Sequence, residues 1–362
     1  TMACVAEALG IAPPGNAAIP AADSQRLLLA EATGGQAVEL ARKGVKPSDI
    51  VTTAAFDNAI RVLHAIGGST NAVIHLIAIA GRLGIDLRLE RFDELARSTP
   101  FLLDLKPSGR FLMEDFFYAG GLPALMAELA PLLDLSAPSV TGKSLGENIA
   151  GAKVWNREVI HPRAQPLHPE GGLAVLRGSL APGGAIIKPT AASPSLLRHR
   201  GRAVVFEDHD DLNRRIDSTE LDVRPDDVLV LRHSGPIGGP GMPEWGFLPI
   251  PRKLLAAGVR DMVRISDARM SGTAFGTVVV HVSPESAAGG PLAAVRDGDS
   301  IELDVPNRRL ELLVEPKELT RRLAEASPRP PRVDRGYRWL YANHVLQADR
   351  GCDFDFLRAK AR

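Results

Sequence analysis

Two glycine-rich runs place reactive side chains where a ligand can approach the backbone. Residues 234–244 contain four glycines and three prolines and end on Glu244, the only carboxylate of the run. Glycine allows close backbone approach and lets N–H groups project into a cavity, and a carboxylate is the donor that a hard cation such as Mg²⁺ prefers. The run predicts a ligand-binding loop with Glu244 as a metal ligand. A tight structural turn with an exposed glutamate explains the same residues.

A second run, residues 266–277, carries the hydroxyl groups of Ser271 and Thr273 in its middle part. It follows a predicted strand at 262–265, so both side chains lie where that strand ends. A serine acts as a base only where nearby positive charge, such as a metal cluster, lowers its pKa. Ser271 is therefore a candidate base. A serine that caps the next element is the alternative.

Other chemical motifs are weaker. Residues 142–144 resemble the end of a phosphate-binding loop, but the position of the required first glycine is Ala137, which favours a surface turn. The sequence has no HExxH, CxxC or GxSxG pattern. His233 and His281 lie near the two glycine-rich runs and are candidates to line a site there.

Composition narrows the class of protein. The chain has 362 residues, of which 45% are hydrophobic and 24% charged, enough for a large core in about two domains. Its 43 basic and 43 acidic residues balance, which argues against a nucleic-acid partner or an anionic membrane surface. Two distant cysteines, Cys4 and Cys352, indicate no disulfide framework and suit a reducing compartment. No apolar run reaches the roughly 18–20 residues that cross a bilayer. We therefore expect a cytoplasmic protein without a membrane or nucleic-acid partner.

The first part of the chain has helical patterns. Helices are predicted at 24–43, 57–66, 71–83, 92–97, 122–133 and 141–150, and residues 1–10 resemble the inside of another. The pair Gly34 and Gly35 leaves open two shorter helices in place of the first. Ser69 or Thr70 is placed to cap the helix at 71–83.

The pattern changes after about residue 155. Short β-branched runs separated by turn residues occur at 185–188, 203–206, 228–232, 262–265, 277–282, 300–305 and 310–314. Seven such runs predict a mainly β domain, and a barrel is one architecture that they can form. Three prolines within 161–170 predict a stiff linker, and residues 329–332 close the β part. Aromatic residues in the last thirty positions predict a helical tail that packs back on the body.

Six blocks along the chain together resemble the dihydroxy-acid and sugar-acid dehydratase family, which includes phosphogluconate dehydratase. They are residues 67–72, 171–174, 238–242, 271–273, 281–285 and 304–308, in the order expected for the family. The resemblance covers essentially the whole chain. Blocks at 188–193, 201–207, 242–246 and 266–273 look like those of the aldonate (pentonate) dehydratases, which act on acids such as L-arabonate or D-xylonate.

The resemblance implies a fold, a domain organisation and an oligomeric state. The fold is α/β: residues 1–165 as the C-terminal, largely helical part of a cluster-binding α/β domain, 166–330 as a swivelling β-barrel-like domain, and 331–362 as the helical tail. The active site would lie between the domains. A homodimer or homotetramer is expected.

The family resemblance also implies a hydro-lyase that removes water from a small 2,3-dihydroxy sugar acid and leaves a 2-keto-3-deoxy acid. An iron–sulfur cluster, [2Fe–2S] or [4Fe–4S], and Mg²⁺ would serve as Lewis acids. By the matching motifs, Ser271 is the base that takes the C2 proton, Glu244 is a magnesium ligand and Thr273 contacts the substrate.

Two alternatives remain open at this stage. Within the family, the chain could belong to a dihydroxy-acid dehydratase of branched-chain amino-acid synthesis. From another class, it could be a non-catalytic homologue that binds a small molecule, although Ser271 and Glu244 are both present.

The resemblance places the family's three cluster cysteines, its other magnesium carboxylates and its modified metal-binding lysine before Thr1, and neither Cys4 nor Cys352 matches a cluster position. We therefore predict that residues 1–362 alone carry no iron–sulfur cluster and no dehydratase activity. Anaerobic purification of this chain, followed by visible absorbance and a 2-keto acid assay, tests this. Cluster absorbance together with turnover would contradict it.

Overall fold

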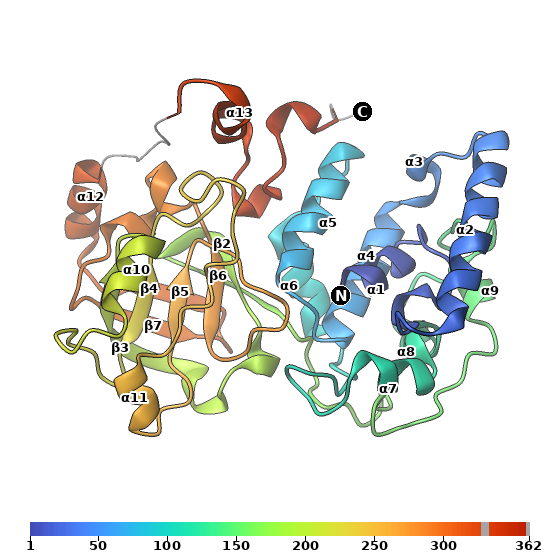
Figure 1. Ribbon diagram of the computed structural model, residues 1–362, viewed down its shortest axis with the longest axis horizontal. Helices are drawn as coiled ribbons and strands as arrows, with labels where there is room; N and C mark the ends of the chain where they lie inside the picture. The colour runs from blue at the N-terminus through green and yellow to red at the C-terminus, as the bar shows by residue number, and fades with distance from the viewer. Residues whose placement is uncertain (327–332, 360–362) are drawn as a thin grey trace. The chain divides into compact units, whose positions relative to one another are not determined.

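The computed structural model describes residues 1–326 and 333–359, which form two compact units (Figure 1). The first unit contains residues 1–68 and 92–172, and the second begins with 69–91 and continues from 173. The domain boundaries predicted at 165 and 330 remain predictions. The closing run predicted at 329–332 lies outside the described residues.

The first unit is helical. It contains α1 (Met2–Ala8), α2 (Ser24–Arg42), α3 (Pro47–Ile50), α4 (Thr53–Ala65), most of α6 (Leu89–Arg97), α7 (Met113–Tyr118), α8 (Gly121–Leu129) and α9 (Leu145–Ile149). The core forms largely from α4 and α8, where Phe56, Ile60 and Leu125 are fully buried. Helix α4 begins before the predicted residue 57 because Thr52 caps it, accepting a hydrogen bond from the Ala55 N–H at 3.2 Å.

Helix α2 continues through the glycine pair. Asp23 caps it by accepting a hydrogen bond from the Gln25 N–H at 2.8 Å, and the helix then runs unbroken past Gly34 and Gly35. Two shorter helices, the possibility left open by the sequence, therefore do not form. No residue of α2 is buried.

The second unit contains a closed eight-stranded barrel, which confirms the barrel that the β-branched runs predict. Its strands are β1 (Ala174–Gly178), β2 (Ala181–Ile187), β3 (Arg198–Phe206), β4 (Val228–Leu231), β5 (Arg264–Ser266), β6 (Val278–Ser283), β7 (Ser300–Asp304) and β8 (Arg309–Leu312). Their order around the barrel is β1-β2-β6-β5-β4-β3-β7-β8. Seven strands overlap the predicted runs, and β1 was missed.

Four neighbouring strands, β3, β4, β5 and β6, run parallel. Alternate side chains such as Val205, Val230 and Ile265 fill the barrel interior. The opposite faces of β3 and β4 pack against α10 (His209–Arg215) and α11 (Arg252–Ala256). Because the four strands are parallel, the loops that follow them emerge at one edge of the barrel.

Helix α5 (Asn71–Arg82) belongs to the second unit, with α12 (Pro316–Glu325) and α13 (Gly336–His344). The segment after α13 lies on α5: Arg82 forms an ion pair with Asp353 at 2.7 Å, and Gly351 lies against Ala78. Among the described residues, no helix combines the length and apolar character needed to cross a membrane.

Arg264 is a buried cation on β5, with only 2% of its surface exposed. Its guanidinium pairs with Asp261 at 2.9 Å, donates a hydrogen bond to the Leu248 carbonyl at 3.1 Å and lies over the Phe247 ring at 5.0 Å. Asp261 in turn accepts hydrogen bonds from the N–H and hydroxyl groups of Thr277. This network joins the two ends of the 266–277 loop.

We predict that Arg264→Leu lowers the free energy of unfolding by about 3–5 kcal/mol, because it leaves the Asp261 carboxylate buried without its counter-charge. Arg252→Leu is the matched control. Arg252 also pairs with an aspartate, Asp217, at 3.0 Å, but its side chain is 85% exposed, so the loss should stay below about 1 kcal/mol. Urea denaturation measures both; equal losses would contradict the prediction.

Candidate active site

The two glycine-rich loops lie side by side at the carboxyl edge of the parallel strands. The loop at 234–246 follows β4 and the loop at 267–277 follows β5, its neighbour. The Gly246 N–H donates to the Arg269 carbonyl at 2.8 Å, and Arg269 Nε donates to the Met242 carbonyl at 2.5 Å. The segments that carry Glu244 and Ser271 are thus hydrogen-bonded to one another.

A fully buried carboxylate, Asp267, anchors the start of both loops. Its oxygens accept hydrogen bonds from the Ser234 N–H at 3.0 Å, the Ser286 N–H at 2.9 Å and the Ser286 hydroxyl. Burial raises the pKa of Asp267 above its usual range, against the opposing effect of these hydrogen bonds. The side chain therefore ties the ends of β4, β5 and β6 together at the edge where the loops emerge.

A second buried carboxylate, Glu285, holds the middle of the 234–246 loop. It accepts hydrogen bonds from the N–H groups of Ile237 and Gly238, both at 2.9 Å, and from Gln347 Nε2 at 2.7 Å. Gly235 is packed so closely that an added Cβ would lie 2.7 Å from Glu285 Oε2. Burial, with a smaller effect of the Asp267 charge, raises the pKa of Glu285 to about 7.

The predicted base and substrate contact lie together on the second loop. Ser271 is half-buried, Thr273 is exposed, and their hydroxyl oxygens are 3.0 Å apart. On either side of them, Met270 and Ala274 pack against the outer face of β6. The loop is therefore anchored by its apolar side chains while the two hydroxyl groups remain accessible.

Glu244 is exposed at the end of the first loop and meets the start of α5. Asn71 Nδ2 lies 3.4 Å from Glu244 Oε1 and donates a second hydrogen bond to the Met270 carbonyl at 2.8 Å. The Met270 carbonyl belongs to the peptide that precedes Ser271. One amide group thus contacts both loops that carry the predicted site residues.

The two residues predicted as candidates to cap α5 divide that role. Thr70 is the N-cap residue, but its side chain makes no capping hydrogen bond. Ser69 Oγ accepts a hydrogen bond from the Asn71 N–H at 3.2 Å. Ser69 also lies against Gly272, where an added Cβ would be 3.0 Å from the Ser69 Cβ.

Lys188 is a candidate functional residue that no local sequence pattern marks, although it begins the block at 188–193. It follows β2 directly and alternates with the inward-facing Ile187, so it shares the outer face of the sheet. Burial lowers its pKa to about 8. A buried lysine with a lowered pKa marks a candidate functional position.

The two candidate histidines differ in their environment. The His233 Nδ1 lies 2.7 Å from the Glu207 carbonyl, so this ring is held by the main chain. His281 is buried, and neither ring nitrogen has a hydrogen-bond partner among the described residues. Burial, with smaller effects of Arg269 and His75, lowers the pKa of His281 to about 3, so its ring is neutral at pH 7.

The side chains of the described residues do not form a complete metal site. Across residues 1–326 and 333–359, no group of three or more His, Cys, Asp or Glu side chains is placed to hold a metal ion. Cys4 is buried in α1, and the Cys352 sulfur lies 3.4 Å from the Met242 sulfur. Glu244 offers one carboxylate, and the described residues do not fit an iron–sulfur cluster.

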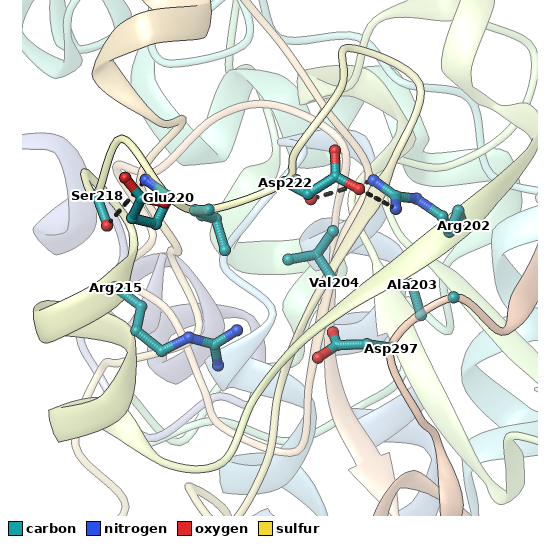
Figure 2. Close-up of a pocket in the computed structure, with 10 residues that line it drawn as sticks. Arg202, Ala203, Val204, Arg215, Ser218, Glu220, Asp222 and Asp297 are labelled. Carbon is teal, nitrogen blue, oxygen red and sulfur yellow. Dashed lines mark hydrogen bonds and ion pairs between the residues drawn. The ribbon is translucent and has the colours of Figure 1, made fainter.

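A cavity of about 360 Å³ lies elsewhere in the second unit (Figure 2). Four of its charged groups are engaged within the protein: Arg202 pairs with Asp222 at 2.6 Å, while Arg215 and Asp297 bond to the main chain of Val205. None of the predicted site residues lines this cavity. Its position therefore does not support a role in the chemistry predicted for the two loops.

Two family models match the chain. Residues 1–148 match the N-terminal domain of the dihydroxy-acid/6-phosphogluconate dehydratases, and residues 158–352 match their C-terminal domain. Together these matches cover both glycine-rich loops and α5.

Curated relatives are similar over nearly the whole chain. The L-arabinonate dehydratase of Rhizobium leguminosarum bv. trifolii is 54% identical over 98% of this chain and 61% of its own length. The L-arabonate dehydratase of Azospirillum brasilense is 56% identical over 98% of this chain and 62% of its own length. A dihydroxy-acid dehydratase of Caldicellulosiruptor saccharolyticus is 45% identical over 97% of this chain and 63% of its own length. The chain thus spans less than two thirds of these relatives.

We predict that the contribution of Glu285 to stability falls as the pH rises from about 5 to about 7. The folded protein holds a proton on Glu285 up to a pKa of about 7, whereas the unfolded chain releases it near the ordinary value of 4.5. At this carboxyl the folded state therefore binds more protons in the window, which lowers stability by up to about 3 kcal/mol, whereas the buried neutral His281 contributes the opposite slope below about pH 6.5.

Glu285→Gln should reduce this slope, measured by urea denaturation between pH 4.5 and 8. Glu7 of the first unit is the matched control, because burial also raises its pKa to about 7. Glu285→Gln and Glu7→Gln should each remove one falling contribution, and the double variant should remove both. An unchanged slope in Glu285→Gln would show that this carboxyl does not titrate in the window.

Proposed function

The chain belongs to the dihydroxy-acid/6-phosphogluconate dehydratase family, and from this we propose that the protein dehydrates a 2,3-dihydroxy sugar acid. The proposed substrate is an aldonate of the pentonate class, such as L-arabonate, and the product is its 2-keto-3-deoxy acid. The higher identity to the two L-arabonate dehydratases, compared with a dihydroxy-acid dehydratase, supports the sugar acid.

The observation that carries the proposal is the joining of the two glycine-rich loops. Their contact at the carboxyl edge of β4 and β5 brings a carboxylate, Glu244, and a pair of hydroxyl groups, Ser271 and Thr273, to one region. A dehydratase needs a base for the C2 proton and groups that hold a polar substrate. These side chains suit both needs.

In the proposed reaction, the deprotonated Ser271 Oγ takes the proton from C2 of the substrate. The C3–O bond breaks, and the 3-hydroxyl leaves as water with the proton that Ser271 returns, so Ser271 is again deprotonated. The remaining enol loses its O–H proton to solvent and gains a proton from solvent at C3, which gives the 2-keto-3-deoxy acid. Thr273, 3.0 Å from the Ser271 hydroxyl, would orient that oxygen and contact the substrate.

We also propose an iron–sulfur cluster and Mg²⁺ as cofactors, with Glu244 supplying one magnesium ligand. When bound, such groups supply Lewis-acid chemistry. The donors among the described residues are incomplete for either group, so no step is assigned through them. A homodimer or homotetramer in the cytoplasm is the proposed setting.

A second candidate is the dehydration of a branched 2,3-dihydroxy acid, because dihydroxy-acid dehydratases are also among the relatives, at 45% identity. Both candidates use the same bond changes and differ in the substrate. A non-catalytic small-molecule-binding role is the candidate from another class.

The full-length protein, purified without oxygen and supplied with Mg²⁺, tests these candidates. We expect 2-keto acid formation from L-arabonate or D-xylonate, with less from D-gluconate and 2,3-dihydroxyisovalerate. Ser271→Ala should lower kcat by at least about 1,000-fold, because the base is lost. Ser136→Ala is the control: this serine lies on a turn of the first unit, and its loss should leave kcat unchanged.

Turnover of the branched acid alone would favour the second candidate. Full activity of Ser271→Ala would remove this residue from the role of base. No turnover of any of the four acids, with the cluster shown intact, would leave the binding role.

A further inference from the structure

We propose that Asn71 is a positioning residue for this reaction, whose side-chain amide fixes the Ser271 loop and the Glu244 loop relative to one another. The catalytic part of this inference rests on the function proposed above. The structural part, that one amide couples the two loops, stands on the contacts alone.

Two acceptors surround the amide nitrogen of Asn71. Asn71 Nδ2 donates to the Met270 carbonyl at 2.8 Å and lies 3.4 Å from Glu244 Oε1. A carbonyl and a carboxylate only accept hydrogen bonds, so a flipped amide would place its oxygen against two other oxygens. The orientation of the Asn71 amide is therefore fixed by the loops that it contacts.

Within the described part of the chain, the amide oxygen of Asn71 satisfies no local turn. Its side chain is buried, with 8% of the residue exposed, and its Oδ1 has no hydrogen-bond partner among the described residues. The other buried asparagine, Asn58, uses both ends of its amide to bind the main chain of Asp134, at 2.9 and 2.8 Å. Asn58 satisfies one turn, whereas the hydrogen bonds of Asn71 go to the two loops.

A regular helix supports the Asn71 side chain. Asn71 is the first residue of a twelve-residue helix, α5. One turn later, Ile74 packs with Met242 of the first loop, and Ser69 lies against Gly272 of the second. The helix and the residue two positions before it therefore contact each loop twice, through the Asn71 amide and through close packing. A side chain on such a support transmits little motion to the groups it holds.

The effect on chemistry follows from the chain order. The Met270 carbonyl is one peptide bond from Ser271, so a lost hydrogen bond frees the backbone that carries the proposed base. A displacement of about 1 Å at a reacting group can lower a rate about 100-fold. Loss of the Asn71 amide also removes a hydrogen-bond donor beside the Glu244 carboxylate. Ser271 and Glu244 are then no longer positioned by the same side chain.

The test compares three variants of the full-length protein: Asn71→Ala, Asn71→Asp and the control Asn58→Ala. Asparagine and aspartate have almost the same shape, but aspartate lacks the donor and places a charge beside Glu244. We expect Asn71→Ala to lower kcat about 100-fold with a smaller change in KM, and Asn71→Asp to lower it at least as far. Asn58→Ala should lower the melting temperature by a similar amount to Asn71→Ala while kcat changes less than about threefold.

Hydrogen–deuterium exchange gives a readout that does not require activity. In Asn71→Ala, amide exchange should rise together in residues 240–246 and 267–277, whereas Asn58→Ala should leave both segments unchanged. Full activity of Asn71→Asp, or unchanged exchange in both loops of Asn71→Ala, would overturn the inference. Faster exchange in a protein that turns over none of the sugar acids would support the coupling and reject the proposed function.

Discussion

Parallel pairing of β3 to β6 is the constraint on which the candidate site depends. Parallel strands cannot be joined by tight hairpins, so each connection must leave from one edge and return to the other. The chain places its glycine-rich segments in the outgoing parts of these connections, and neighbouring strands therefore bring neighbouring loops together. Without this pairing, residues 234–246 and 267–277 would have no reason to meet. The edge is where open α/β sheets also bind their ligands.

Two buried carboxylates accept hydrogen bonds from main-chain N–H groups of the 234–246 loop. The 234–246 loop forms turns that satisfy part of its own backbone, such as the hydrogen bond from the Gly239 N–H to the Gly235 carbonyl, but it has no helix or sheet ladder to satisfy the rest. Asp267 accepts a hydrogen bond from the Ser234 N–H, and Glu285 accepts one from the Gly238 N–H. Aliphatic side chains fill the interior of the barrel. Buried carboxylates are unfavourable unless hydrogen-bonded. Their presence shows that loop geometry, as well as core packing, determines the composition of this edge.

Local patterns predicted much of this chain, and their failures have physical causes. The β-branched runs identified seven of the eight strands, whereas β1 contains Arg177 and ends on Gly178, which weakened the signal. The glycine pair in α2 did not break the helix, because glycine lowers helix propensity without forbidding the conformation. Glu244 and Ser271 were identified by residue type beside glycine-rich turns, and their roles stay predictions. The contacts of Asn71 were not predictable, because its partners lie 173 and 199 positions away and no local pattern reports such distances.

Helix α5 has a consequence for how this family can be recombined. By sequence it falls within the N-terminal family model, but by packing it belongs to the unit that contains the barrel. The chain therefore passes between the two units at residues 68–69, 91–92 and 172–173. A chimera joined between the two family models, near residue 150, would combine the α5 of one parent with the loops of the other. Exchange of modules at that junction separates a helix from the surface it evolved to fit, so the functional unit of inheritance is larger than either sequence domain.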